Sequence, residues 1–297
     1  MKTQLRKVAL LTLALALLGN LSFAQRNDDD DDSRDFHLDE VYEMDATGTL
    51  HLNSSDADVR IVGSDRKDVH LKVDRTVESR GINRSRKFDM DVENRGGDLY
   101  ITERRGRGSS FTVGYSRIDY EILVELPQGA SLRVKGDDDD YLVRNVNGSI
   151  EMDVDDGDIE LRECNGDKFD FNLEDGDLKM DGGQGEIFVR IDDGDVDIRD
   201  GKFRELEMAV EDGSIIVETE IFDKGVYEIK GDDARIDFMV LSGGGDFRVI
   251  KDDGRVRASS EFRTIRETDY RSEFELKGGD AEVEIRTNDG SVRLSAR

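Results

Sequence analysis

The chain has 297 residues and a formal net charge of −27, with 70 Asp and Glu against 43 Lys and Arg. Such a charge repels nucleic acid and anionic membranes, so neither is an expected partner. Cys164 is the only cysteine, which excludes an internal disulfide. The fold must therefore rest on a hydrophobic core, which a chain of this length can readily build.

Residues 1–24 have the pattern of a secretory signal peptide. A start with three basic residues is followed by an apolar run over residues 8–18, and small residues at Ser22 and Ala24 precede Gln25. The apolar run is too short to span a membrane, and no second one follows. We therefore expect a soluble exported protein without a membrane span, which is periplasmic, exposed at the cell surface or secreted. Because residue 25 is not Cys, no lipid anchor is expected there.

Residues 25–35 form an acidic leader, predicted to be solvated and disordered. Residues 36–130 are predicted to be an irregular β region that forms the first coils and a cap. Strand-like alternation occurs in four stretches, over residues 49–63, 67–76, 88–104 and 118–134. Between them lie two segments rich in arginine, 79–87 and 104–110, which we interpret as basic loops. These loops could contact an acidic polysaccharide or pair with the acidic remainder of the chain. Pro127, the only proline, is expected to interrupt pairing between the two halves.

Residues 131–297 repeat one turn and one strand. The turn glycines Gly157, Gly176, Gly194 and Gly213 follow one another at intervals of 18 or 19 residues. Two later glycines, Gly254 and Gly290, are 36 residues apart, which we interpret as two intervals of 18. Weaker turns lie between, so each unit holds two strands and two turns, and a fixed period of this length is typical of stacked repeats.

The strands of the repeat alternate apolar and charged residues, which predicts one buried and one solvated face. We predict an all-β fold, a β-solenoid of the parallel β-helix type with two strands per coil of about 18–19 residues. The alternative is a long antiparallel meander or sandwich, because Asp-Gly between alternating strands also favours hairpins. The solenoid explains why every second turn is alike. Its predicted core contains Ile159, Leu161, Phe169, Phe171, Leu178, Val196, Ile198, Ile215 and Val217.

The stretch from residue 121 to residue 164 resembles the bacterial exported "putative adhesin" family, a domain of unknown function. The matching features are a strand, a Pro-x-Gly turn, a second strand and repeated Gly-Asp/Ser-Ile units, here Pro127, Gly129, Gly148-Ser149-Ile150 and Gly157-Asp158-Ile159. The resemblance extends through the chain from about residue 36. It implies a β-solenoid and transfers no catalytic residue, because the shared motifs are structural. The turns of this chain are more acidic than the Asn-Gly turns common in the family.

The repeated acidic turns offer a candidate cation site. In a solenoid they would stack into a ladder of carboxylates, and Ca²⁺ binds oxygen ligands of this kind. The candidate ligands are Asp156, Asp158, Asp175, Asp177, Asp193 and Asp195. The alternative is a solvated edge with diffuse counterions. Calcium is the one cofactor that the acidic turns suggest. A second possible metal site would be shared by His51 and His70.

The sequence favours a protein that is not an enzyme: an adhesin-like binding or scaffold protein of the cell surface or envelope. Its expected partner is a surface polysaccharide or an envelope protein. A calcium-binding solenoid is one alternative, and a polysaccharide-acting enzyme is another. The enzyme would require a cleft with a partly buried carboxylate pair, one acid and one base. No catalytic residue is proposed, because no nucleophile, phosphate-loop or Cys-x-x-Cys motif occurs.

Overall fold

The computed structural model describes residues 35–84, 87–106 and 111–297. The predicted signal peptide and nearly all of the acidic leader lie outside the described residues. Within them, the chain forms one continuous sheet of 24 strands. The described part contains no helix long and apolar enough to cross a membrane.

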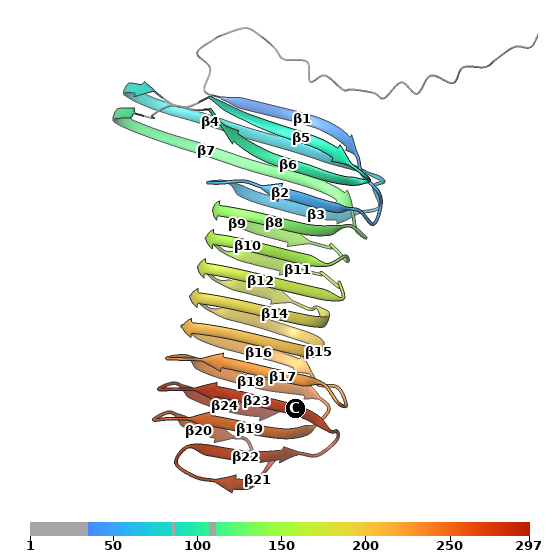
Figure 1. Cartoon of the computed structure of the whole chain (residues 1–297), viewed down its shortest axis with the longest axis vertical. Coiled ribbons are helices and arrows are strands. Elements are labelled where there is room, and N and C mark those ends of the chain that lie inside the picture. The colour runs from blue at the N-terminus through green and yellow to red at the C-terminus, as the bar shows by residue number, and fades with distance from the viewer. Residues whose placement is uncertain (1–34, 85–86, 107–110) are drawn as a thin grey trace, which may run out of the picture. The chain divides into compact units, whose positions relative to one another are not determined.

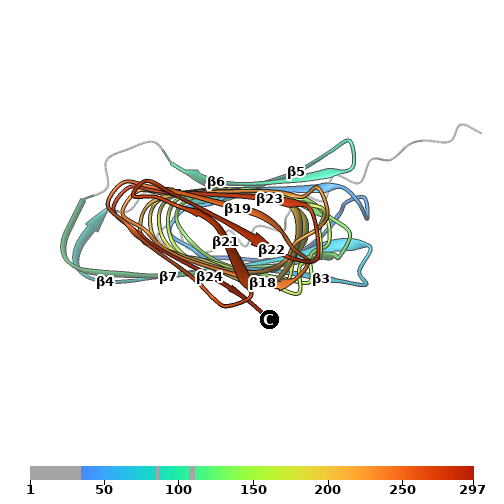
Figure 2. The same ribbon diagram turned by 90° about the horizontal axis from the view of Figure 1, so that it is seen from below.

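The sheet winds into two facing walls that are joined by turns at both sides (Figures 1 and 2). In stacking order, the first wall consists of β5 (Phe88–Arg95), β6 (Asp98–Arg105), β2 (Thr49–Asn53), β8 (Ser131–Asp138), β10 (Ile150–Asp156), β12 (Lys168–Asp175), β14 (Gln184–Asp193), the second half of β15 (Val196–Asp212), β17 (Val226–Gly231), β23 (Ala281–Thr287), β19 (Gly245–Lys251), β22 (Arg271–Leu276) and β21 (Phe262–Glu267). The second wall consists of β1 (Phe36–Glu43), β4 (Asp68–Arg84), β7 (Phe111–Pro127), β3 (Asp58–Ser64), β9 (Asp140–Arg144), β11 (Ile159–Arg162), β13 (Leu178–Asp181), the first half of β15, β16 (Ser214–Glu220), β18 (Arg235–Ser242), β24 (Ser291–Ala296) and β20 (Arg255–Ala258).

The regular coils stack in parallel register, which confirms the solenoid and rules out the meander. Strand β12 pairs in parallel with β10 on one side and with β14 on the other. Equivalent turns of successive coils stack on one another, because Asp175 is the register partner of both Asp156 and Asp193. The turn glycines stack as predicted, since the N–H of Gly157 donates to the carbonyl of Asp175 at 3.0 Å. Among the described strands, antiparallel pairs occur only towards the two ends of the stack.

The predicted core is confirmed. All nine residues proposed from the alternation are at most 1 % exposed, because each coil contributes its inward side chains to the space between the walls. Aromatic rings help to fill this space: Phe169 packs edge-on against Phe203, and Phe247 against Phe262. Burying each such side chain stabilises the fold by roughly 1.5–3 kcal/mol.

The last coil of the sequence is not the last coil of the stack. Strands β23 and β24 insert between β17–β18 and β19–β20, so that Gly254 stacks directly on Gly290. The expected coil between these two glycines is therefore wrong. The intervening residues instead form the antiparallel hairpin β21–β22, which turns the chain back and lets β23 enter beside β19. The C-terminal strand thereby gains a partner on each side.

The N-terminal end has the same kind of insertion. Strands β2 and β3 lie between β6–β7 and β8–β9, and β1 pairs antiparallel with β4. Residues 79–84, expected in a basic loop, belong to strand β4 and pair with residues 111–116 of β7. The physical reason is that two extended segments distant in the sequence pair as antiparallel strands, with Gly81 opposite Gly114. Arg104 and Arg105, expected in the second basic loop, end strand β6, while residues 85–86 and 107–110 of these loops lie outside the described residues.

Candidate functional site

The stacked turns place the predicted calcium ligands on one edge of the solenoid, in two columns with different roles. In the inner column, one carboxylate oxygen of each Asp accepts a main-chain N–H from the next coil. Asp158 accepts from Asp177 at 3.0 Å, Asp177 from Asp195 at 3.0 Å, and Asp195 from Ser214 at 2.8 Å. The second Asp of the Asp-Gly-Asp turn therefore holds adjacent coils together, which leaves it less free to bind a cation.

The outer column is exposed and continues from coil to coil. We name it the acidic edge; its members, in register, are Asp138, Asp156, Asp175, Asp193 and Asp212. A second acidic residue directly precedes each of these five in the sequence. Partial desolvation in the stacked turns, and then the negative charges of Asp156 and Asp193, raise the pKa of Asp175. This shift is what a column of mutually repelling carboxylates produces.

The structure thus brings the six predicted ligands to one edge, but it does not group them as a metal centre. In the described part of the chain, no three His, Cys, Asp or Glu side chains are gathered so as to hold a metal ion. The two histidines proposed to share a metal lie in different walls of the solenoid. His51 stacks on Tyr100 in the first wall, whereas His70 lies in the second wall between Asp39 and Glu125.

The outer faces of the walls differ from the acidic edge, because their charges are paired between neighbouring strands. Arg133 contacts Glu151 at 2.8 Å, and Lys135 contacts Asp153 at 3.0 Å, both across β8 and β10. Similar pairs follow further along the stack, at Arg204–Glu186 and Lys202–Glu220. Each exposed pair adds little stability. Their effect here is on the charge distribution, since the walls are largely neutralised and the negative charge is concentrated on the edge.

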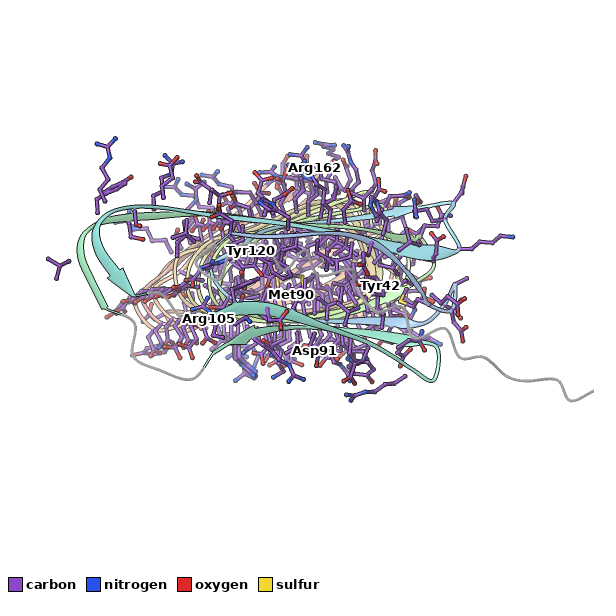
Figure 3. The ribbon with its side chains drawn as sticks, turned by 90° about the horizontal axis from the view of Figure 1, so that it is seen from above. Tyr42, Met90, Asp91, Arg105, Tyr120 and Arg162 are labelled. Atoms are coloured by element: carbon purple, nitrogen blue, oxygen red, sulfur yellow. The ribbon has the colours of Figure 1, made fainter. Side chains whose placement is uncertain are left out.

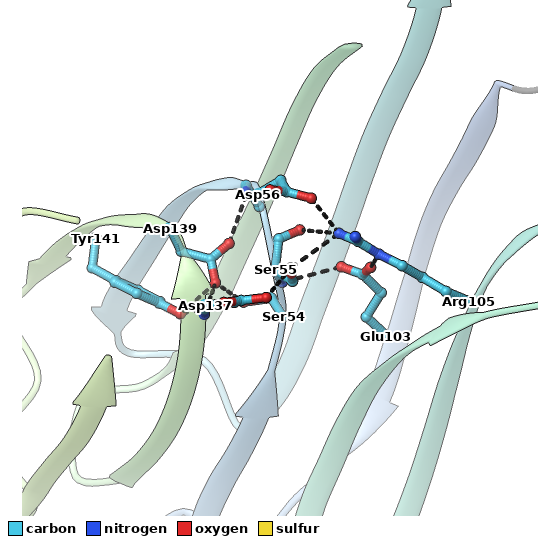
Figure 4. Close-up of polar contacts among 9 residues, drawn as sticks. Ser54, Ser55, Asp56, Glu103, Arg105, Asp137, Asp139 and Tyr141 are labelled. Carbon is cyan, nitrogen blue, oxygen red and sulfur yellow. Dashed lines mark hydrogen bonds and ion pairs between the residues drawn. The ribbon is translucent and has the colours of Figure 1, made fainter. Parts of the chain in front are cut away.

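A buried carboxylate takes the place of the turn glycine where the N-terminal coils meet the regular repeat (Figure 4). Asp139 is fully buried, and a Cβ on the next glycine of the column, Gly157, would lie 2.1 Å from its carbonyl oxygen. The Asp139 carboxylate accepts hydrogen bonds from the N–H of Ala57 at 2.6 Å, the hydroxyl of Tyr141 at 3.1 Å and that of Ser54 at 3.2 Å. Burial raises the pKa of Asp139 despite these donors. The residue joins the inserted β2–β3 coil to β8–β9.

A second buried carboxylate lies beside the same turn. The side chain of Glu103 is 4 % exposed, accepts the N–H of Ser55 at 3.1 Å and pairs with Arg105. Burial, and then the charge of Glu103, raise the pKa of Tyr120. Figure 3 shows Tyr120 in the space between the two walls.

These two carboxylates do not form the cleft that the enzyme alternative requires. Asp139 and Glu103 are enclosed by donors from the fold, and neither lines either of the two surface hollows found at this end. They act as structural anchors of the junction. Sequence reasoning missed both, although an Asp in place of the repeated glycine was a visible signal at position 139.

One of the surface hollows, of about 800 Å³, lies where a projecting ribbon leaves the stack. The ribbon consists of residues 76–84 of β4 and 111–119 of β7, and we name it the β4–β7 arm (Figures 1 and 2). The arm contributes Arg117, Ile118 and Asp119 to the hollow. The opposite side of the hollow comes from the turns, with Asp138, Asp140 and Asp156.

Several solved structures are similar to this chain at low sequence identity. A "putative adhesin" from Parabacteroides distasonis ATCC 8503 is 12 % identical, with a TM-score of 0.48 over 87 % of this chain and 97 % of that one. A "putative adhesin" from Bacteroides fragilis NCTC 9343 is 8 % identical, with a TM-score of 0.45 over the same shares. A "putative cell adhesion protein" from Clostridium sporogenes ATCC 15579 is 14 % identical, with a TM-score of 0.30 over 88 % of this chain and all of that one.

None of the curated proteins has a sequence detectably similar to this chain. The model of one protein family, described as Toastrack DUF4097, matches residues 48–295. This match covers the inserted N-terminal coil, every regular coil and nearly all of the last strand, β24. The chain therefore belongs to the Toastrack family, a β-solenoid domain of unknown function.

Proposed function

We propose that the protein is an exported binding or scaffold protein that acts without catalysis, by presenting a rigid charged surface to a partner in the cell envelope. The signal-peptide pattern of residues 1–24 supports export. The observation that carries the binding role is the contrast between the neutralised walls and the acidic edge, which forms no ion pair with any residue that the structure describes. A fixed column of carboxylates attracts a cationic partner at long range and orients it along the column.

The chemistry that fits this edge is a basic patch on an envelope protein. Successive carboxylates repeat at the spacing of paired strands, about 4.8 Å. An extended segment with closely spaced Lys or Arg can therefore contact several of them at once. An acidic polysaccharide is a poor partner for the same edge, because like charges repel.

The test compares two variants with the same loss of negative charge. One carries Asp156→Asn, Asp175→Asn and Asp193→Asn on the acidic edge. The control carries Glu151→Gln, Asp170→Asn and Glu207→Gln, all on the outer face of the first wall. Binding of a decalysine peptide is measured by calorimetry at low and physiological salt.

The edge variant should lose most of its affinity for the peptide, and its binding should depend less on salt. The wall variant should bind nearly as well as the unmodified protein. Equal losses in both variants would show that only net charge matters and would refute a specific role for the acidic edge.

A further inference from the structure

The β4–β7 arm is an unusual feature because it continues as two strands after the core beneath it has ended. Tyr120, the first residue of β7 after the arm, is 5 % exposed, whereas residues 113–119 before it are exposed. Pairing nevertheless continues from Thr76 opposite Asp119 to Arg84 opposite Phe111. A two-stranded ribbon without a supporting core is marginally stable in water. A surface that covers the arm would therefore stabilise it.

The described part of the arm exposes large apolar side chains. Val113 is 53 % exposed, Tyr115 is 57 % exposed and Ile118 is 48 % exposed. Because successive residues of a strand point to opposite faces, Val113 and Tyr115 share one face and Ile118 lies on the other. Apolar contact is thus available on both faces of the ribbon.

The arm also has the opposite charge to the rest of the molecule. The outer part of the arm, residues 79–84 and 111–116, contains Arg80 and Arg84 and no acidic residue, in a chain with a net charge of −27, whereas the base of the arm adds Glu78, Arg117 and Asp119. Arg80 is exposed and is the register partner of Tyr115, while Arg117 is exposed and contacts Asp119 at 2.9 Å. Cationic and aromatic side chains therefore lie side by side on the arm.

The acidic edge lies beside the base of the arm, where Asp138 and Asp156 share a hollow with Arg117 and Ile118, but it does not reach the outer part. Tyr115 precedes Tyr120 by five residues, which corresponds to roughly 17 Å of extended strand. Electrostatic interactions are screened over about 8–10 Å at physiological ionic strength. An anionic surface that contacts the outer part of the arm is thus about two screening lengths from the point at which the arm leaves the solenoid. Its repulsion by the acidic edge is largely screened at that distance.

We propose that the β4–β7 arm binds the surface of a membrane that contains anionic lipids. Arginine guanidinium groups suit lipid phosphates, to which they donate paired hydrogen bonds. Tyrosine favours the boundary between headgroups and acyl chains, and exposed Val and Ile gain free energy by leaving water there. Net charge alone argued against an anionic membrane as a partner, and the separate position of the arm removes that objection.

The exposed aliphatic side chains favour lipid over the two competing partners. A polysaccharide offers polar groups that Val113 and Ile118 cannot hydrogen-bond, whereas a lipid boundary accepts them. A second copy of the chain would bring two large negative charges together. The proposal is independent of a basic partner at the acidic edge, so the two can fail separately.

The chain contains no tryptophan, which allows a single fluorescent reporter. Tyr115→Trp places the reporter on the arm, and Tyr270→Trp places a control on an exposed residue beside the C-terminal hairpin. Each full-length variant is titrated with vesicles of phosphatidylcholine alone, and with vesicles of phosphatidylcholine and phosphatidylglycerol at 7:3. The emission of the arm reporter should shift to shorter wavelength with the anionic vesicles only, and that of the control reporter should not shift with either.

Two further variants test the chemistry in sedimentation with the same vesicles. Arg80→Ala should lower the partition coefficient roughly fivefold, the effect of one basic residue near an anionic surface. Asp156→Asn with Asp175→Asn should leave membrane binding at least as strong as in the unmodified protein, because these residues lie outside the arm. Unchanged melting temperatures would show that the exposed substitutions leave the fold intact.

Three outcomes would overturn the proposal. The first is an emission spectrum of the Tyr115→Trp variant that anionic vesicles do not change. The second is equal binding to both kinds of vesicle. The third is a shift of the arm reporter with the soluble acidic polysaccharide alginate but not with vesicles, which would assign the arm to a sugar polymer.

Discussion

Replacing Gly176 with alanine tests the stacking of the turns directly. The φ angle of Gly176 is +139°, in a region that residues with a Cβ rarely adopt. A Cβ at this position would lie 2.2 Å from the carbonyl oxygen of Gly157 in the adjacent coil. That carbonyl has little room to move, because the N–H of Gly157 is held by Asp175 at 3.0 Å. The substitution therefore adds a steric clash with main chain to the conformational strain.

Gly182 provides a matched control for this prediction. Its φ angle is +91°, but no atom lies within 4 Å of the position that a Cβ would take. Gly182→Ala should therefore show only the conformational cost, about 1–3 kcal/mol. Gly176→Ala should show a similar cost together with about 1–3 kcal/mol for overpacking. The difference between the two variants isolates the contact between coils.

Urea denaturation followed by circular dichroism measures this difference, with the free energies compared at equal m-values. We expect Gly176→Ala to lower the free energy of unfolding by about 1–3 kcal/mol more than Gly182→Ala. Equal destabilisation by the two substitutions would mean that the Gly176 turn does not pack against the Gly157 turn, and the stacked arrangement of the turns would be refuted.

Three other predictions follow from the core, the acidic edge and the buried junction. Phe171→Ala should lower the free energy of unfolding by about 3–5 kcal/mol in the same denaturation assay, and an unchanged midpoint would contradict its inward position. NaCl and CaCl₂ at matched ionic strength should raise the melting temperature equally if the acidic edge is only screened. A larger effect of CaCl₂ that Asp156→Asn with Asp175→Asn and Asp193→Asn abolishes would instead establish calcium binding. The raised pKa of Asp139 means that the native state holds its proton to higher pH than the unfolded chain, so this residue lowers stability as pH rises above about 4. Asp139→Asn should reduce that fall between pH 4 and 7, and an identical pH profile would contradict the burial of an ionisable carboxyl group.

The regular part of the fold could be predicted from the sequence because its information is local and repeated. Alternation in each strand fixed which side chains face inward, and all nine predicted core residues are buried. The interval of 18–19 residues between turn glycines fixed the length of a coil and therefore the parallel register. The six candidate aspartates fell on one edge for the same reason, since equivalent positions of a repeat must stack.

The division of those aspartates into two roles could not be predicted from the pattern. Asp156 and Asp158 flank the same glycine and look equivalent in sequence. Only the geometry of the turn directs the carboxylate of Asp158 to the main chain of the next coil and leaves that of Asp156 in water. Likewise, Asp139 looks like one more acidic turn residue, and its burial depends on the β2–β3 coil that packs over it.

Both ends of the stack were decided by tertiary structure. The order of strands there depends on which distant segments meet, and a local period carries no information about that. Strands β23 and β24 therefore lie inside the stack although they end the sequence, because the hairpin β21–β22 reverses the chain. The arm arises in the same way: residues 79–84 become a strand only because residues 111–116, far along the chain, supply their hydrogen-bond partners.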